Sequence, residues 1–229
     1  MKISLLFSSI LIAGTAFGSS CVSGSLQSYI NLGAGGCDLG AISLSQFALA
    51  PGQNGATPIN SSQVLVTPGG SQFAPTLQFS LATTATAPNL LESFFRLRAS
   101  GPMLTGDTLT LNHSSASGDG VDTALEYICP GASFGVNSPV GCPGSASLVT
   151  FINLSFSQST DVKTFPATSF FDIFVDLSAD GGLTGSANFG SATVQITATP
   201  EPASLLLGVT GLALLAVSRC RISKKWKLF

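Results

Sequence analysis

The segment Thr76-Leu-Gln-Phe-Ser-Leu81 alternates apolar and polar side chains. Successive side chains of an extended chain point to opposite faces, so its three apolar residues share one face while Gln78 and Ser80 lie on the other. The same alternation occurs at Leu109-Thr-Leu111 and at Val194-Gln-Ile196. These segments predict strands that have one buried face and one face in water.

Similar short runs recur through the middle of the chain, separated by the Pro-Gly, Gly-Gly and Asp-Gly pairs that are typical of turns. No segment between residues 19 and 199 has a helical period over three turns. The candidate strands are 26–32, 42–49, 63–67, 76–81, 92–99, 104–111, 124–129, 148–157, 169–177 and 192–198. This pattern predicts an all-β domain, an antiparallel β-sandwich or jelly-roll-like fold whose two sheets bury Phe, Leu, Ile and Val between them.

Charged residues are scarce and unevenly distributed. Only 9% of the 229 residues are charged and 45% are hydrophobic, whereas about 25% charged residues is usual in a soluble domain. Between Ser19 and Pro202 only Arg96, Arg98 and Lys163 oppose all eleven carboxylates, which gives this part a formal net charge of −8. A charge of this sign repels phosphate backbones, so we expect no nucleic-acid partner.

Residues 1–18 have the parts of a secretory signal peptide. Lys2 precedes an apolar stretch, and Ala16-Phe17-Gly18 places small residues at the −3 and −1 positions of a cleavage site. An uncleaved anchor helix is the alternative, but the apolar stretch is shorter than the roughly 20 residues that a bilayer span needs. We therefore expect residues 19–199 to be an exported domain.

The other end of the chain has three consecutive parts. Pro200-Glu201-Pro202 is followed by residues 203–218, which are all apolar or small, and then by the basic tail 219–229. As a helix the apolar part would be about 24 Å long, close enough to a hydrocarbon core of about 30 Å to span it as a transmembrane helix. The basic tail is expected to stay in the cytoplasm, which leaves the Pro-Glu-Pro segment outside.

This order of motif, apolar helix and basic tail resembles the PEP-CTERM sorting signal. The resemblance implies that an exosortase, a transpeptidase-like membrane enzyme, cuts the chain near Pro200, Glu201 and Pro202 and passes the protein to the cell surface or the extracellular polysaccharide. The inner membrane then holds only an intermediate. A permanent single-span anchor is the alternative. The segment 21–37 also resembles the start of many PEP-CTERM proteins, and this looser match carries no catalytic residues.

Five cysteines in an exported chain suggest two disulfides and one remaining thiol. Cys220 is the remaining one because it lies in the basic tail. Of the three connectivities we prefer the local one, Cys21–Cys37 and Cys129–Cys142, in which each disulfide closes a short loop worth roughly 3 kcal/mol on the chain-entropy model. Four free buried thiols are the alternative.

A serine-hydrolase motif occurs once but lacks its context. Gly131-Ala-Ser-Phe-Gly135 matches the G-x-S-x-G pattern of a nucleophilic serine, yet the only histidine, His113, precedes it, whereas that fold needs the histidine after the serine. The motif also falls between Cys129 and Cys142. A Gly/Ser turn is the preferred interpretation, and His113 is interpreted as a turn residue.

Acidic residues offer two weak alternatives. Asp176, Ser178 and Asp180, followed by Gly181, match the start of an EF-hand calcium loop, but position twelve is Ala187 instead of Glu. A β-turn is preferred, with a weak calcium site that also uses Asp172 or the pair Asp119 and Asp122 as the alternative. That pair could also serve a glycosidase, which needs two carboxyl groups at a set separation.

The sequence thus predicts an exported surface or extracellular protein that is associated with polysaccharide or biofilm matrix, and not an enzyme. No catalytic residue, no confident metal ligand and no cofactor are expected apart from possible weak calcium. A secreted carbohydrate-active enzyme built on the same sandwich, and a permanently anchored surface protein, are the alternatives.

Overall fold

The computed structural model of the chain describes residues 19–135 and 138–199. The strands are β1 (Gly24–Ser25), β2 (Cys37–Leu39), β3 (Ile42–Leu49), β4 (Thr57–Pro58), β5 (Leu65–Ser71), β6 (Ala74–Thr86), β7 (Leu90–Asn112), β8 (Ser115–Ser117), β9 (Val121–Pro130), β10 (Ala146–Asn153), β11 (Ser157–Gln158), β12 (Thr160–Asp180) and β13 (Ser186–Ala198), with one helix, α1 (Leu26–Ile30). The all-β prediction is confirmed. Apart from the short parallel contact between β4 and β7, the strand pairs are antiparallel.

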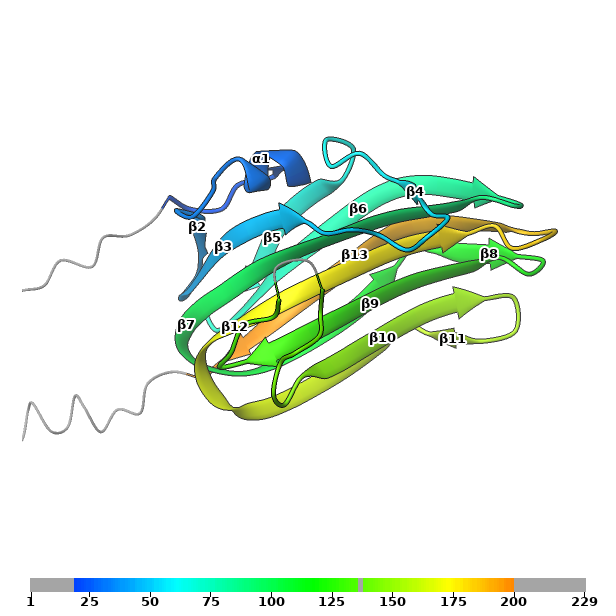
Figure 1. Cartoon of the computed structure of the whole chain (residues 1–229). Coiled ribbons are helices and arrows are strands. Elements are labelled where there is room, and N and C mark those ends of the chain that lie inside the picture. Colours follow the sequence, from blue (N-terminus) through cyan, green and yellow to red (C-terminus); the bar gives the residue numbers. More distant parts are fainter. Residues whose placement is uncertain (1–18, 136–137, 200–229) are drawn as a thin grey trace, which may run out of the picture.

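Two long strands join the layers of the sandwich. Residues 90–100 of β7 pair with β3 and with residues 170–180 of β12, whereas residues 104–112 pair with β13 and with residues 160–164 of β12. Figure 1 shows both strands curving at the left end of the molecule. The first layer therefore contains β3, β9, β10, residues 90–100 of β7 and residues 170–180 of β12. The second layer contains β5, β6, β13, residues 104–112 of β7 and residues 160–164 of β12.

The core lies between these layers and follows the alternation in the sequence. Leu77 and Phe79 of β6 are at most 1% exposed, and Phe95 of β7 is fully buried. The Phe79 and Phe95 rings, from opposite layers, have centroids 4.9 Å apart. Apolar burial of this kind is the main favourable contribution to folding.

The expected elements differ most from the structure in two places, and several other strands differ at their ends; residues 154–156 of the expected strand 148–157, for example, lie between β10 and β11. Residues 26–32 were expected to form a strand, but Leu26–Ile30 is a helical turn whose N-cap, Ser25, accepts a hydrogen bond from the Ser28 backbone N–H at 3.2 Å. Its buried residues Leu26 and Tyr29 have the i, i+3 spacing of a helix. The expected strands 92–99 and 104–111 are one continuous strand, because the chain bends at Gly101-Pro102 without leaving the sheet.

Both disulfide predictions are confirmed. Cys21 bonds to Cys37, and Cys129 bonds to Cys142. The second bond holds the β9–β10 loop against β12, where Phe134 and Phe174 form a small separate apolar cluster with ring centroids 5.4 Å apart. Disulfides of this kind are typical of periplasmic or extracellular proteins.

The predicted export segments fall outside the described residues. Residues 1–18 and 200–229, and with them the Pro-Glu-Pro motif and Cys220, are not described. Within the described part, no helix combines the length and apolar character that a bilayer crossing requires.

Candidate functional site

A cleft of about 260 Å³ opens on the outer face of the first layer. Alternation along the strands creates its floor: Phe95 of β7 and Val175 of β12 point into the core, so their neighbours Phe94 and Asp176 point outward. We call it the acid cleft. Its lining residues are Pro51, Gly52, Gln53, Glu92, Phe94, Leu125, Tyr127, Pro139 and Asp176.

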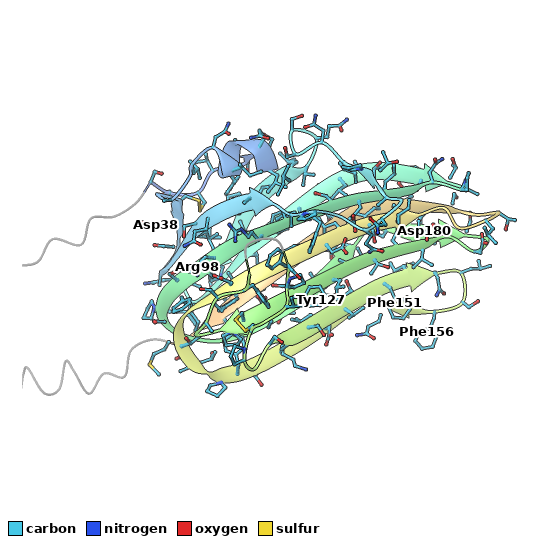
Figure 2. The ribbon with its side chains drawn as sticks, in the orientation of Figure 1. Asp38, Arg98, Tyr127, Phe151, Phe156 and Asp180 are labelled. Atoms are coloured by element: carbon cyan, nitrogen blue, oxygen red, sulfur yellow. A yellow bond between two sulfur atoms is a disulfide. The ribbon has the colours of Figure 1, made fainter. Side chains whose placement is uncertain are left out.

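Strand register brings the floor together. Asp176 pairs with Phe94 on one side and with Leu125 on the other, and Tyr127 pairs with Phe174 one step along the sheet. Phe94 and Tyr127 are half-buried, so both residues are partly accessible from the cleft. Figure 2 shows Tyr127 over the middle of the first layer, away from the curved end.

The β3–β4 loop forms one wall of the acid cleft. The Gln53 backbone N–H donates to the Glu92 Oε2 at 2.7 Å, and the Gln53 side-chain Nε2 donates to the Asp176 Oδ2 at 3.4 Å. A Cβ on Gly52 would lie only 2.0 Å from the Glu92 Oε2. Glycine at position 52 is therefore what lets this loop close over the Glu92 carboxyl group.

The two carboxyl groups of the acid cleft are buried. Glu92 is 3% exposed and Asp176 is 8% exposed. The pKa of Asp176 is raised to about 7, mainly by burial and in part by the negative charge of Glu92. The hydrogen bond from the Gln53 amide partly opposes this shift. The site can thus bind a proton, a cation or a hydroxyl donor.

A second set of acids lies inside the sandwich. Asp107, Asp122 and Glu126 are at most 1% exposed. Burial raises the pKa of Glu126 to about 7, and burial together with the nearby Glu126 charge raises the pKa of Asp107 well above its usual range. Burial likewise raises the pKa of Asp122 to about 7. None of these three acids lines the acid cleft, and all three are buried.

Residues 176–180 were expected to form a β-turn, with a calcium loop as the alternative, but they are the last residues of the strand β12. Asp176, Ser178 and Asp180 are alternate residues of β12 and are spread along one face instead of converging, and Asp180 accepts a hydrogen bond from the Gly182 N–H at 2.8 Å. Among the described residues no three His, Cys, Asp or Glu side chains form a group that could hold a metal ion.

The other sequence candidates are separated or occupied. Asp119 accepts hydrogen bonds at 2.9 Å from the backbone N–H groups of Leu183 and Thr184, which hold its pKa below the usual range, whereas Asp122 points into the core, so the two do not form a pair. Asp172 forms an ion pair with Arg98 at 2.6 Å.

In the described part of the chain, the serine of the G-x-S-x-G motif is hydrogen-bonded to a cation and not to a base. Its Oγ accepts a hydrogen bond from the Arg98 Nη2 at 2.6 Å. His113 follows the end of β7 with φ of 54°, as expected for a turn residue. Both interpretations of these residues as turn or loop positions agree with the structure.

Sequence reasoning did not find Glu92, Gln53 or Tyr127 as site residues. Glu92 and Asp176 are 84 positions apart, and only strand pairing brings them to one cleft. The sequence did contain an indication of this site, because each acid lies within a run of apolar strand residues. Burial of a charged side chain there is unfavourable, so such a residue is often functional.

Comparisons with known proteins add no functional assignment. No family model matches the chain, and no curated protein matches its sequence. Among solved structures, the chain is similar to TmCBM61, solved in complex with β-1,4-galactotriose, with 13% identity and a TM-score of 0.25 over 67% of this chain and 81% of that one. It is also similar to the Trichoderma harzianum endoglucanase 3 from family GH12, with 13% identity and a TM-score of 0.24 over 68% of this chain and 97% of that one. Similarity at this level carries no argument about activity.

Proposed function

We propose that this protein is exported, sorted through a PEP-CTERM tail by an exosortase, and retained at the cell surface or in the matrix, where it binds polysaccharide in the acid cleft without cleaving it. The observation that carries the proposal is the composition of the cleft. Phe94 and Tyr127 offer aromatic surface for the apolar face of a sugar ring, and Gln53 and Asp176 offer hydrogen-bonding groups between them.

Burial of Glu92 favours binding over hydrolysis. A glycosidase needs two carboxyl groups that flank the scissile bond and reach its atoms. The Glu92 Oε2 is already bonded to the Gln53 backbone N–H, and the loop at Gly52 covers it. The cleft therefore offers at most one reachable acid to a sugar, and this arrangement supports a binding site.

The test is co-sedimentation of the protein with insoluble exopolysaccharide from its own cells. We expect Tyr127→Ala to weaken binding about tenfold, because a stacked ring in a desolvated position commonly contributes more than 1 kcal/mol. Phe156→Ala is the matched control, because Phe156 is an exposed aromatic residue on a different part of the surface, beside Phe151 (Figure 2). Unchanged binding by Tyr127→Ala, or release of soluble sugar that Asp176→Asn abolishes, would contradict the proposal.

A further inference from the structure

Among the described residues, no basic side chain forms an ion pair with Glu92 or Asp176. Within residues 19–135 and 138–199 there is one ion pair, between Arg98 and Asp172. It lies on the same outer face of the first layer, but it does not involve either acid of the cleft. The Glu92 Oε1 and the Asp176 Oδ1 are buried and accept no hydrogen bond from any described atom. Two buried negative charges side by side without a counter-charge are unfavourable, so these oxygens fit a positively charged partner, which is either a proton or a metal cation.

Their surroundings have the form of a built site. Glu92 comes from β7, Asp176 from the adjacent β12, and Gln53 from the loop that covers both. The Gln53 side-chain contact is long, at 3.4 Å, and the oxygen and nitrogen of an amide exchange places by a simple flip. With the amide turned over, its oxygen faces the Asp176 carboxyl group, so that the oxygen-bearing side chains of Gln53, Glu92 and Asp176 line one part of the cleft.

We propose that Glu92, Asp176 and Gln53 bind a calcium ion at the floor of the acid cleft. Calcium takes six to eight oxygen ligands in flexible geometry, of which two carboxylates and one amide supply up to five, and water supplies the others. Two carboxylates also balance the charge of a divalent cation. A set with only two acids fits the weak affinity, about 10⁻⁴–10⁻³ M, of extracellular calcium modules.

This site differs from the calcium loop that the sequence suggested. It shares Asp176 with that loop but uses neither Ser178 nor Asp180, which lie further along β12. It shares Gln53 and Asp176 with the proposed sugar-binding surface, but it is tested separately, because calcium alone is the probe and no sugar is needed. Failure of one proposal therefore leaves the other to its own test.

The test is thermal unfolding of the full chain, purified in detergent and freed of metal with a chelator, at pH 8. Addition of about 10 mM calcium is expected to raise the unfolding midpoint by about 3–5 °C. Glu92→Gln and Asp176→Asn are expected to remove this shift and, because each removes a buried charge, to raise the midpoint measured without calcium. A merely destabilised variant would lower that midpoint.

Asp122→Asn is the matched control. Asp122 is a buried acid of the core that does not line the cleft, so this variant is expected to keep the full calcium shift. Terbium luminescence gives a second readout, because Tyr127 lines the cleft and can sensitise a bound lanthanide, an ability that Tyr127→Phe removes. The proposal is overturned if calcium does not shift the wild-type midpoint, in which case the two acids share a proton, or if the shift survives in Glu92→Gln and Asp176→Asn.

Discussion

Individual side chains in the core make the stability of this protein depend on pH in an unusual direction. Asp107 and Glu126 face each other from opposite layers of the sandwich, and both have raised pKa values because they are buried. The folded protein therefore holds their protons more tightly than the unfolded chain does. Their contribution to stability is complete below the unfolded pKa of about 4 and is lost as the pH rises toward 7.

The free energy of unfolding is accordingly expected to fall between about pH 4 and pH 7, when measured by urea denaturation in the presence of a chelator. For Glu126, whose pKa rises from 4.5 to about 7, the contribution is about 3 kcal/mol. Glu126→Gln should flatten this pH dependence and be more stable than the wild type at pH 8. Stability that increases steadily from pH 4 to pH 8 would show that these acids are ionised and paired in some other way.

Residue chemistry was only partly predictable from the sequence. The two disulfides could be predicted because short loops between cysteines leave few sensible pairings. The acid cleft could not, because Gln53, Glu92 and Asp176 come from three distant segments and meet only through strand register. The Asp176-Ser178-Asp180 motif was misleading, since the same spacing that fits a calcium loop also fits one face of a strand.

At the level of elements, alternation predicted the strands well and their ends poorly. The segment 42–49 was predicted to the residue as β3, while β7 and β12 extend well beyond the segments expected for them. Gly101-Pro102 looks like a turn in the sequence but is a bend inside β7. Glycine and proline in a sequence indicate where the backbone can bend. Whether the chain beyond the bend stays in the sheet depends on its pairing with distant strands.

A bulge in β13 shows how one glycine controls two strand pairings. The register against β6 shifts between Phe189 and Ser191, and a Cβ on Gly190 would lie 2.4 Å from the His113 carbonyl oxygen. Gly190→Ala must push these backbones apart, so we expect it to lower the free energy of unfolding by about 1–3 kcal/mol. The measurement is the urea midpoint, with the exposed Gly35→Ala as the control, because its nearest atom lies at 3.7 Å. Equal midpoints for the two variants would mean that the bulge yields at little cost.

The whole molecule has both ends of the described chain on one side. The Thr199 N–H donates to the Met103 carbonyl oxygen at 3.0 Å, beside the curved part of β7, and the Asp38 N–H donates to the Ser19 carbonyl oxygen at 2.8 Å, next to the start of β3. Figure 1 shows this end at the left. Glu92 lies eight residues along β7 from Ser100, which is about 26 Å. A membrane holding either end would therefore leave the acid cleft at a distance from the bilayer.

Because both ends lie away from the cleft, the sorting role of residues 200–229 can be tested separately from the binding function of the domain. Replacing the motif by Pro200→Ala, Glu201→Ala and Pro202→Ala should leave an uncut chain in the inner membrane, because the extended prolyl segment that an exosortase would need is lost. Mass spectrometry of cell fractions provides the measurement: peptides containing Trp226 should be absent from wild-type surface protein and present in the membrane fraction of the variant.

A chain lacking residues 200–229 should instead be exported and lost to the medium, with its disulfides and cleft intact, since the last described strand ends at Ala198. Trp226 peptides in the wild-type surface fraction would identify a permanent anchor, and the sandwich would then work as a tethered module.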